Sequence, residues 1–191
     1  MEQNTNQAGA SKEENAVVLD FLQHGYPADK RPMHMKTPIV QALGKTRFVL
    51  LELVPKKEIF LQPHEEVYIG EGKREKIHHI IGKLSINRLT STARAELEFV
   101  IKDLIHKHIN DFVNFFNKAG PLTTRMHQLE LLPGLGKKHM WEVLEQRKIE
   151  PFKDIEDLKK RVTLMPDPEK LITKRIMKEL EGNEKHNLFI D

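Results

Sequence analysis

The sequence has 191 residues, of which 39% are hydrophobic and 31% are charged. This length and composition are typical of a folded protein with one sizeable core or two smaller ones, and they exclude collagen-like and wholly disordered chains. There are no cysteines, which excludes disulfide bonds and thiolate metal sites and favours a reducing cytoplasmic location. The polar start and the lack of 18 consecutive apolar residues predict neither an export signal nor a membrane span.

The net charge of +3 is small, but positive charge is unevenly distributed along the chain. Residues 30–89 hold twelve basic and six acidic residues, whereas residues 121–191 hold fourteen and thirteen. A positive field that attracts nucleic acid is therefore expected over residues 30–89. In the C-terminal segment, only local lysine clusters and backbone dipoles could attract phosphate.

The N-terminal half has the pattern of short β-strands. Residues 1–15 are polar and are expected to form a disordered tail. Apolar runs separated by glycines and prolines follow, and they predict strands at 16–22, 39–40, 48–54, 67–69, 77–81 and 84–86. Because several short strands in about 70 residues suit a small barrel that hides its sheet edges, residues 16–89 are predicted to form an OB-like β-barrel domain.

The remaining chain has helical periodicity. Apolar residues recur at three- and four-residue steps from Leu97 to Phe116, which predicts one linking helix over residues 90–120. Helical patterns also precede and follow a glycine turn, so residues 121–182 are predicted to form a helix-hairpin-helix domain, and residues 183–191 a C-terminal tail. The predicted fold class is α+β: an OB-like barrel, a linking helix and an all-helical domain.

The segment Leu132-Pro133-Gly134-Leu135-Gly136-Lys137-Lys138 is the most specific motif in the sequence. The two glycines let the backbone turn tightly and leave no Cβ in the way of a phosphate, while the leucine between them anchors the turn. The helix that begins near Lys137 presents free N–H groups and the positive end of its dipole, which together bind anions. The two lysines add positive charge at the same place.

This arrangement resembles the helix-hairpin-helix family, whose members contact nucleic-acid backbones without reading bases. It departs from many members at Met140, where they have a small residue. Residues 15–182 as a whole, including Phe115-Phe116-Asn117-Lys118-Ala119 and Pro151-Phe152-Lys153, also resemble the archaeal domain-of-unknown-function family 655 (DUF655). That resemblance implies a barrel ahead of a hairpin domain and a predicted role in RNA binding.

Other basic segments are weaker signals. Lys73, Arg74 and Lys76 form a basic loop on the barrel that could follow a phosphate backbone, although nearby glutamates are equally consistent with a solvated loop tip. A second phosphate site is not expected at residues 163–168, because prolines and an acid replace the glycines there. The predicted nucleic-acid-binding residues are Gly134, Leu135, Gly136, Lys137, Lys138, His139, Lys73, Arg74 and Lys76.

Enzyme and metal chemistry find little support in the sequence. Adjacent histidines such as His78-His79 are expected to point to opposite faces of a strand, so no metal site or other cofactor is predicted. Asp154 follows the hairpin, where glycosylases of the helix-hairpin-helix class place a catalytic aspartate, but capping the next helix is the simpler role. No Walker loop or nucleophile elbow is present, and the protein is predicted not to be an enzyme.

The sequence thus favours sequence-nonspecific binding of nucleic acid through phosphate contacts. RNA is preferred over DNA because of the family resemblance, and no membrane partner is expected. Two alternatives stay open. One is a protein-interaction adaptor in a translation or transcription assembly, in which the hairpin is only structural. The other is an accessory factor in repair or recombination of duplex DNA.

Overall fold

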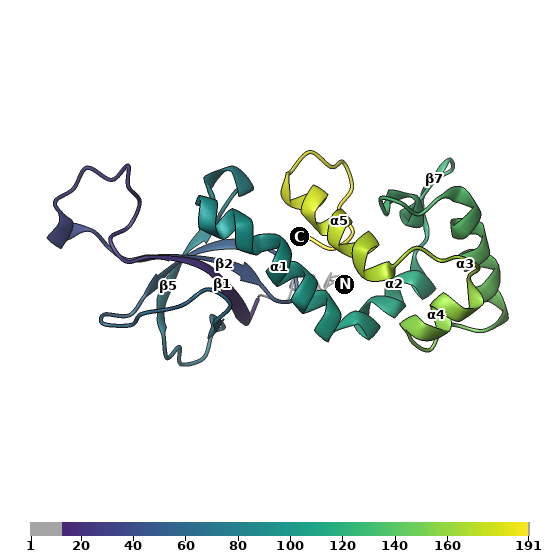
Figure 1. The fold of residues 1–191 in the computed structure, drawn as a ribbon, viewed down its shortest axis with the longest axis horizontal. Helices are drawn as coiled ribbons and strands as arrows, with labels where there is room; N and C mark the ends of the chain where they lie inside the picture. Colours follow the sequence, from purple (N-terminus) through teal and green to yellow (C-terminus); the bar gives the residue numbers. More distant parts are fainter. Residues whose placement is uncertain (1–12, 191) are drawn as a thin grey trace, which may run out of the picture.

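The computed structural model describes residues 13–190 and shows a curled antiparallel sheet followed by helices (Figure 1). The strand order is β4-β1-β2-β3-β5, and no ladder joins β4 to β5 in the described part of the chain. The sheet is therefore a half-barrel that is open on one side, which confirms the predicted α+β class with an OB-like barrel. The strands are β1 (Asn15–Leu22), β2 (Ile39–Gly44), β3 (Leu50–Pro55), β4 (Glu66–Tyr68) and β5 (Ile77–Lys83).

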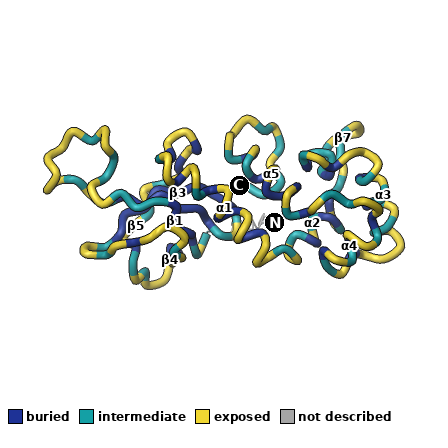
Figure 2. Tube along the Cα trace, viewed as in Figure 1, coloured by how far each residue is buried: buried dark blue, intermediate teal, exposed yellow. Residues whose placement is uncertain are grey.

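Both faces of the central strands of this sheet are buried. Because side chains alternate along a strand, Val17 packs into one core and Val18 into another. Every residue of β2 and β3 is buried, and Figure 2 shows these strands in dark blue. The central strands consequently offer no open surface on which bases could stack.

The predicted single linking helix is wrong. The chain instead forms α1 (Ser91–Lys107), a 3-10 turn η3 (Ile109–Phe112) and a short α2 (Val113–Lys118). His108 leaves the helical conformation, with φ −122° and ψ 24°, and its N–H is shared between two carbonyls of the last turn of α1. The apolar stripe continues across the break because Val113 and Phe116 face the same core as α1.

The segment after α2 also differs from the prediction, because only one turn of 3-10 helix, and no α-helix, precedes the glycine turn. Residues 121–127 form a two-stranded ribbon, and a single 3-10 turn follows. The Gln128 side chain accepts the Gly120 N–H at 2.8 Å, and His127 Nδ1 accepts the Leu129 N–H at 3.2 Å. These contacts hold the ribbon and leave one turn of helix before the motif. The elements are β6 (Pro121–Thr123), β7 (Met126–His127) and η4 (Gln128–Leu131).

Three helices complete the fold: α3 (Lys137–Ile149), α4 (Ile155–Arg161) and α5 (Pro168–Leu180). Asp154 caps α4 as predicted, since its carboxylate accepts the Asp157 N–H at 2.7 Å. One hydrophobic core runs from the α1-facing side of the sheet through all of these helices. The hairpin end is therefore held to the sheet by continuous packing.

The predicted C-terminal tail is docked rather than free up to residue 190. The buried Glu179 carboxylate accepts the backbone N–H groups of Leu188, Phe189 and Ile190 at 2.7 to 3.0 Å. These three apolar side chains pack against the main core, which explains why the segment is ordered. Arg175 forms an ion pair with Glu179 at 2.7 Å, with both side chains buried.

Most of the predicted N-terminal tail, residues 1–12, lies outside the described residues. The last three residues of that prediction are structured, because Asn15 begins β1 and the Glu13 carboxylate accepts the Thr46 and Arg47 N–H groups. Within residues 13–190, none of the helices has the length and apolar character needed to cross a bilayer.

Candidate nucleic-acid interface

The predicted motif forms a tight turn, residues 132–138, which we call the first hairpin. Leu132 and Leu135 are buried, and the Leu135 N–H donates to the Leu132 carbonyl at 3.1 Å. Gly134 has φ +106°, and a Cβ there would lie 3.2 Å from Leu171 Cδ2. Glycine is thus required for both the backbone conformation and the close approach of α5. Leu135 anchors the turn as predicted, and the buried Leu132 does so too.

The start of α3 is open to solvent. Gly136 is the N-cap residue of α3 and provides no side-chain cap. The first N–H groups of the helix have no intrahelical partner, and they lie at the positive end of its dipole. Lys137 and Lys138 are exposed at the same place, and no ion pair of either lysine is found within residues 13–190. This helix start has the composition of an anion site.

His139 lies on the inner side of the same turn. Its Nδ1 atom is buried and has no hydrogen-bond partner in the described structure. A Cβ on Gly136 would lie 3.8 Å from this nitrogen. Buried polar atoms are nearly always paired in folded proteins, so this unpaired nitrogen is an exception at the first hairpin.

The structure contains a second turn of the same shape, residues 162–168, which we call the second hairpin. Its Met165 N–H donates to the Val162 carbonyl at 3.2 Å, as in the first hairpin. Leu164 has φ +52°, thirty positions after Gly134, and α5 has thirteen residues, as α3 does. The sequence placed residues 163–168 where a second glycine turn would lie, but the leucine gave no indication of a positive φ.

The two hairpins differ in how the following helix begins. Asp167 caps α5, since its carboxylate accepts the Glu169 N–H at 3.1 Å. Pro168 occupies the first turn and has no N–H to offer. An anion at the start of α5 would be repelled by the Asp167 carboxylate, and it would find one N–H donor fewer than at the start of α3. That the second hairpin is not a phosphate site stays a prediction, which this cap and Pro168 support.

Each long helix supports the other hairpin. On α3, the Glu142 carboxylate accepts the Thr163 N–H of the second hairpin at 2.7 Å, and this bond lowers the pKa of Glu142 from 4.5. On α5, Leu171 packs on Gly134 of the first hairpin, and Arg175 donates to the Leu131 carbonyl at 3.3 Å. The two hairpins therefore form one reciprocal unit at the helical end of the molecule.

The basic loop on the barrel is largely engaged in local contacts. Lys76 forms an ion pair with Glu65 at 2.5 Å, which lowers the pKa of that carboxyl. Arg74 Nε donates to the Gly70 carbonyl at 2.9 Å. Lys73 is exposed and lines a shallow cleft of about 490 Å³. The sheet and α3 lie at opposite ends of the molecule, so the loop and the first hairpin are not brought together (Figure 1).

The prediction that His78 and His79 point to opposite faces is wrong. A β-bulge shifts the register between Val54 and Pro55 and leaves His78 without a partner on β3. The two imidazoles consequently lie together, with 2.8 Å between their Nδ1 atoms. No cluster of three or more His, Asp or Glu side chains with metal-binding geometry occurs within residues 13–190.

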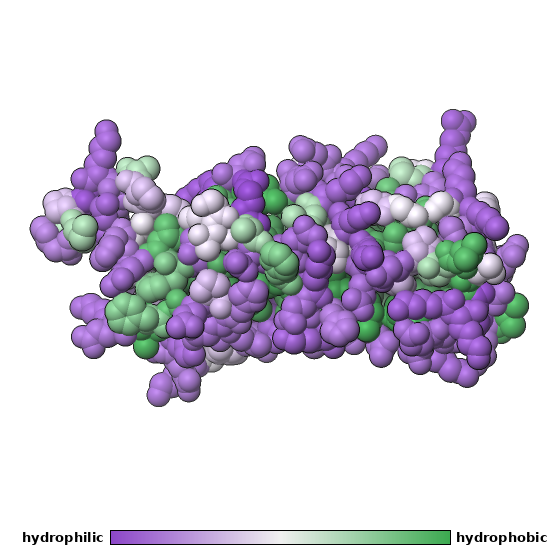
Figure 3. Space-filling view, in the orientation of Figure 1, coloured by the Kyte–Doolittle hydropathy of each residue, from purple (hydrophilic) through white to green (hydrophobic). Residues whose placement is uncertain are grey.

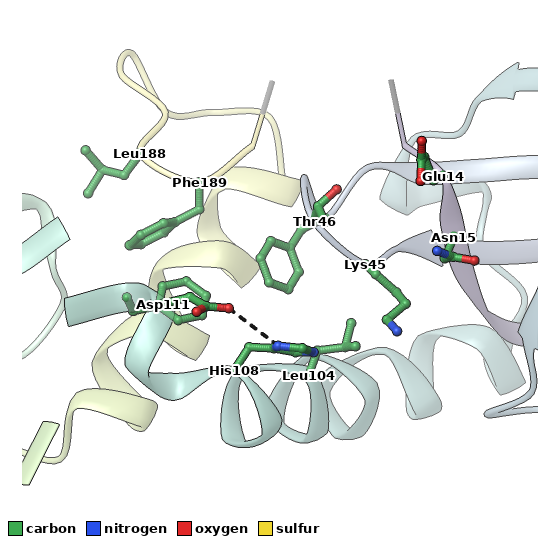
Figure 4. Close-up of a pocket in the computed structure, with 11 residues that line it drawn as sticks. Glu14, Asn15, Lys45, Thr46, Leu104, His108, Asp111, Leu188 and Phe189 are labelled. Atoms are coloured by element: carbon green, nitrogen blue, oxygen red, sulfur yellow. Dashed lines mark ion pairs between the residues drawn. The ribbon is translucent and has the colours of Figure 1, made fainter. Parts of the chain in front are cut away.

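A separate cavity of about 720 Å³ lies between the sheet and the docked C-terminal segment (Figure 4). Phe48, Phe112 and Phe189 are among its apolar lining residues. His108 lies at its border and pairs with Asp111 at 3.4 Å, as the dashed line in Figure 4 marks. The cavity shares no lining residue with either hairpin.

Comparison with known proteins agrees with the architecture. Residues 12–191 match the protein family described as "Protein of unknown function (DUF655)". The chain is 41% identical over 178 residues to the uncharacterized protein MJ0038 of Methanocaldococcus jannaschii, covering 93% of this chain and 79% of that protein. It is also similar to the crystal structure of Af1531 from Archaeoglobus fulgidus, with 43% identity and a TM-score of 0.83, covering 94% of this chain and all of that one. The chain therefore belongs to the DUF655 family.

Proposed function

We propose that this protein binds nucleic acid without sequence specificity, by holding a backbone phosphate at the first hairpin. The observation that carries the proposal is the open start of α3, where Gly136 provides no cap and Lys137 and Lys138 are exposed. The second hairpin has the same turn but is closed by Asp167 and Pro168. This difference between the two helix starts supports a binding role for the first hairpin, in addition to its structural role as a turn.

In this proposal the free N–H groups after Gly136 donate to phosphate oxygens, and the two lysines add charge-assisted contacts. None of these groups reads a base edge, so binding is sequence-nonspecific. RNA takes priority over DNA because of the family resemblance. The protein acts in this proposal as a binding protein and not as an enzyme.

The barrel has a smaller role than the sequence suggested. Its central strands are buried on both faces, and two of the three basic loop residues are engaged by Glu65 and the Gly70 carbonyl. Lys73 is the remaining basic residue of that loop, and it is exposed and could contact phosphate. The barrel then supports binding chiefly through the excess of positive charge in residues 30–89.

The experiment that tests the proposal is fluorescence anisotropy with labelled single-stranded RNA, duplex RNA and duplex DNA across a salt series. The test variant is Lys137→Ala/Lys138→Ala. The matched control is Lys160→Ala/Lys174→Ala, which removes the same charge from exposed positions on α4 and α5 where no ion pair is found within residues 13–190. Circular dichroism verifies that both variants are folded.

We expect binding that weakens as salt rises, and a log–log slope that falls by roughly one for each phosphate that the test variant no longer binds. The control variant should lower affinity much less. If the two variants weaken binding equally, the first hairpin is not the phosphate site. If the wild-type protein binds none of the three nucleic acids at low salt, the proposal fails and the adaptor alternative replaces it.

A further inference from the structure

Trp141 is the one tryptophan of the chain, and it lies on the exposed side of α3 with 60% of its surface accessible. Residues three and four positions apart share a helix face, so Lys137 and Lys138 lie on the same side one turn earlier. One turn rises about 5.4 Å. A group attached to a phosphate held at the start of α3 is therefore within reach of the indole.

On the side away from the lysines, Trp141 is followed on the same helix face by the half-buried Leu144 and the exposed Glu145. Its neighbour Glu142 holds the second hairpin through the Thr163 N–H, and Leu164 at the tip of that hairpin is 85% exposed. Hydrophobic side chains reach the surface over this helical end of the molecule (Figure 3). An exposed aromatic ring thus lies on the same helix face as a basic helix start.

This combination matches the chemistry of single-stranded nucleic acid. Cationic groups follow the backbone while an aromatic side chain stacks on a base, and every base has a face that can stack. In a duplex the base faces are already stacked on one another and are covered. An indole beside a phosphate site is consequently complementary to an unpaired nucleotide.

The second hairpin argues against a duplex for a different reason. A duplex carries two backbones, and a protein with two equivalent open hairpins could hold both of them. Here the second helix start carries the Asp167 carboxylate and Pro168, which repel or fail to bind phosphate. The paired hairpins thus provide one phosphate site and one closed site.

We propose that the ligand is a single-stranded segment, whose phosphate is held at the first hairpin and whose adjoining base stacks on Trp141. This inference rests on the proposed function and specifies its ligand. The chain itself supplies the readout, because its intrinsic tryptophan fluorescence comes from this residue alone.

The test combines two signals. Anisotropy of a labelled oligouridine or a matched duplex reports binding, and Trp141 emission reports stacking. Inorganic polyphosphate serves as a ligand with phosphates but no bases. The variants are Trp141→Ala, Trp141→Phe and, as a matched control, Phe99→Ala, which removes an aromatic side chain 62% exposed on α1.

We expect oligouridine to quench Trp141 emission, and polyphosphate to bind without the same quenching. Trp141→Ala should weaken oligouridine binding by about tenfold, the effect of losing one stacked base, while Trp141→Phe and Phe99→Ala should weaken it less. Duplex of equal length should bind the wild-type protein more weakly.

The results that would contradict these expectations separate the stacking inference from the proposed function. If oligouridine binds by anisotropy but leaves Trp141 emission unchanged, or if Trp141→Ala binds as the wild type does, the stacking inference is overturned and the phosphate site stands. The exposed indole is then available for a protein partner. If the protein binds neither oligouridine nor duplex, both the inference and the proposed function fail.

Discussion

The two hairpins have the same backbone turn and different chemistry. Each closes with an N–H donated to a carbonyl three residues earlier, has a positive φ at its tip and leads into a thirteen-residue helix. The first ends in glycine and lysine, whereas the second ends in an aspartate cap and a proline. The shape of such a turn therefore does not identify a phosphate site, and the first turn of the following helix decides it.

The hairpins also differ in how firmly they are supported. The first is backed by the buried Arg175, which donates to the Leu131 carbonyl and pairs with Glu179 and Glu184. The second is backed by Glu142 at the surface. We expect changes behind the first hairpin to cost far more stability than changes behind the second.

The largest expected effect follows from replacing Arg175 with methionine. Removing one partner of a buried ion pair leaves an uncompensated charge and destabilises a protein by about 3–5 kcal/mol. The free energy of unfolding, measured by urea titration, should fall by this amount. A decrease below about 1 kcal/mol would show that the Arg175 network is not what supports the first hairpin.

The double variant Arg175→Met/Glu179→Gln serves as the control, because it removes both charges. It should recover part of the lost stability, since no uncompensated carboxylate is left inside the protein. Equal instability of the single and double variants would point to the backbone hydrogen bonds of Glu179 rather than to its charge.

Substitutions at the tips of the two hairpins should have opposite effects on stability. Gly134→Ala forces a side chain into a positive φ against Leu171 and should cost about 1–3 kcal/mol. Leu164→Gly relieves a positive φ of +52° at an exposed position and should be neutral or slightly stabilising. Thermal or urea unfolding checks both variants. A similar decrease in stability in both would disprove the assigned roles of the two tips.

A smaller effect is expected from opening the second hairpin. Asp167→Gly/Pro168→Lys removes the carboxylate cap and supplies an N–H and a cation, as in the first hairpin. Affinity for duplex nucleic acid should rise, and the log–log salt slope should steepen by about one if one further phosphate is bound. Asp167→Gly alone is the control for removal of the cap. An unchanged slope would mean that the second hairpin lies away from the bound backbone.

The smallest expected effect is a pH dependence from Glu142. The backbone and side chain of Thr163 lower the pKa of this carboxyl from 4.5, so the ionised form is favoured in the folded protein. Its contribution is therefore present above pH 4.5 and is lost as pH falls through the lowered pKa. The urea midpoints of wild type and Glu142→Gln should differ at neutral pH and converge in acid. A difference between the two urea midpoints that persists in acid would contradict this role of Glu142.

The sequence predicted the strand-rich half, the α+β class and the anchored glycine turn, because apolar spacing and glycine positions report local structure directly. It did not predict that the segment before the turn is a ribbon and a single 3-10 turn and not an α-helix. The Gln128 and His127 side chains bond backbone groups there and hold a ribbon, and such side-chain hydrogen bonds leave no periodic pattern. The break in the linking helix at His108 was missed for a similar reason, since the apolar stripe continues across it.

Two other features lay outside the reach of local patterns. The bulge that brings His78 and His79 together depends on pairing with β3. The docking of the C-terminal segment depends on Glu179, a distant acceptor, although the run Leu188-Phe189-Ile190 was a signal that this segment belongs to the core.

The shared core has a practical consequence for the way this molecule unfolds. Val17 and Leu43 of the sheet pack in the same cluster as Leu132 and Ile176 of the helical end. A fragment that ended near residue 89 would expose the whole α1-facing side of its sheet to water. We therefore expect one cooperative calorimetric transition, and the hairpins are best studied within the intact chain.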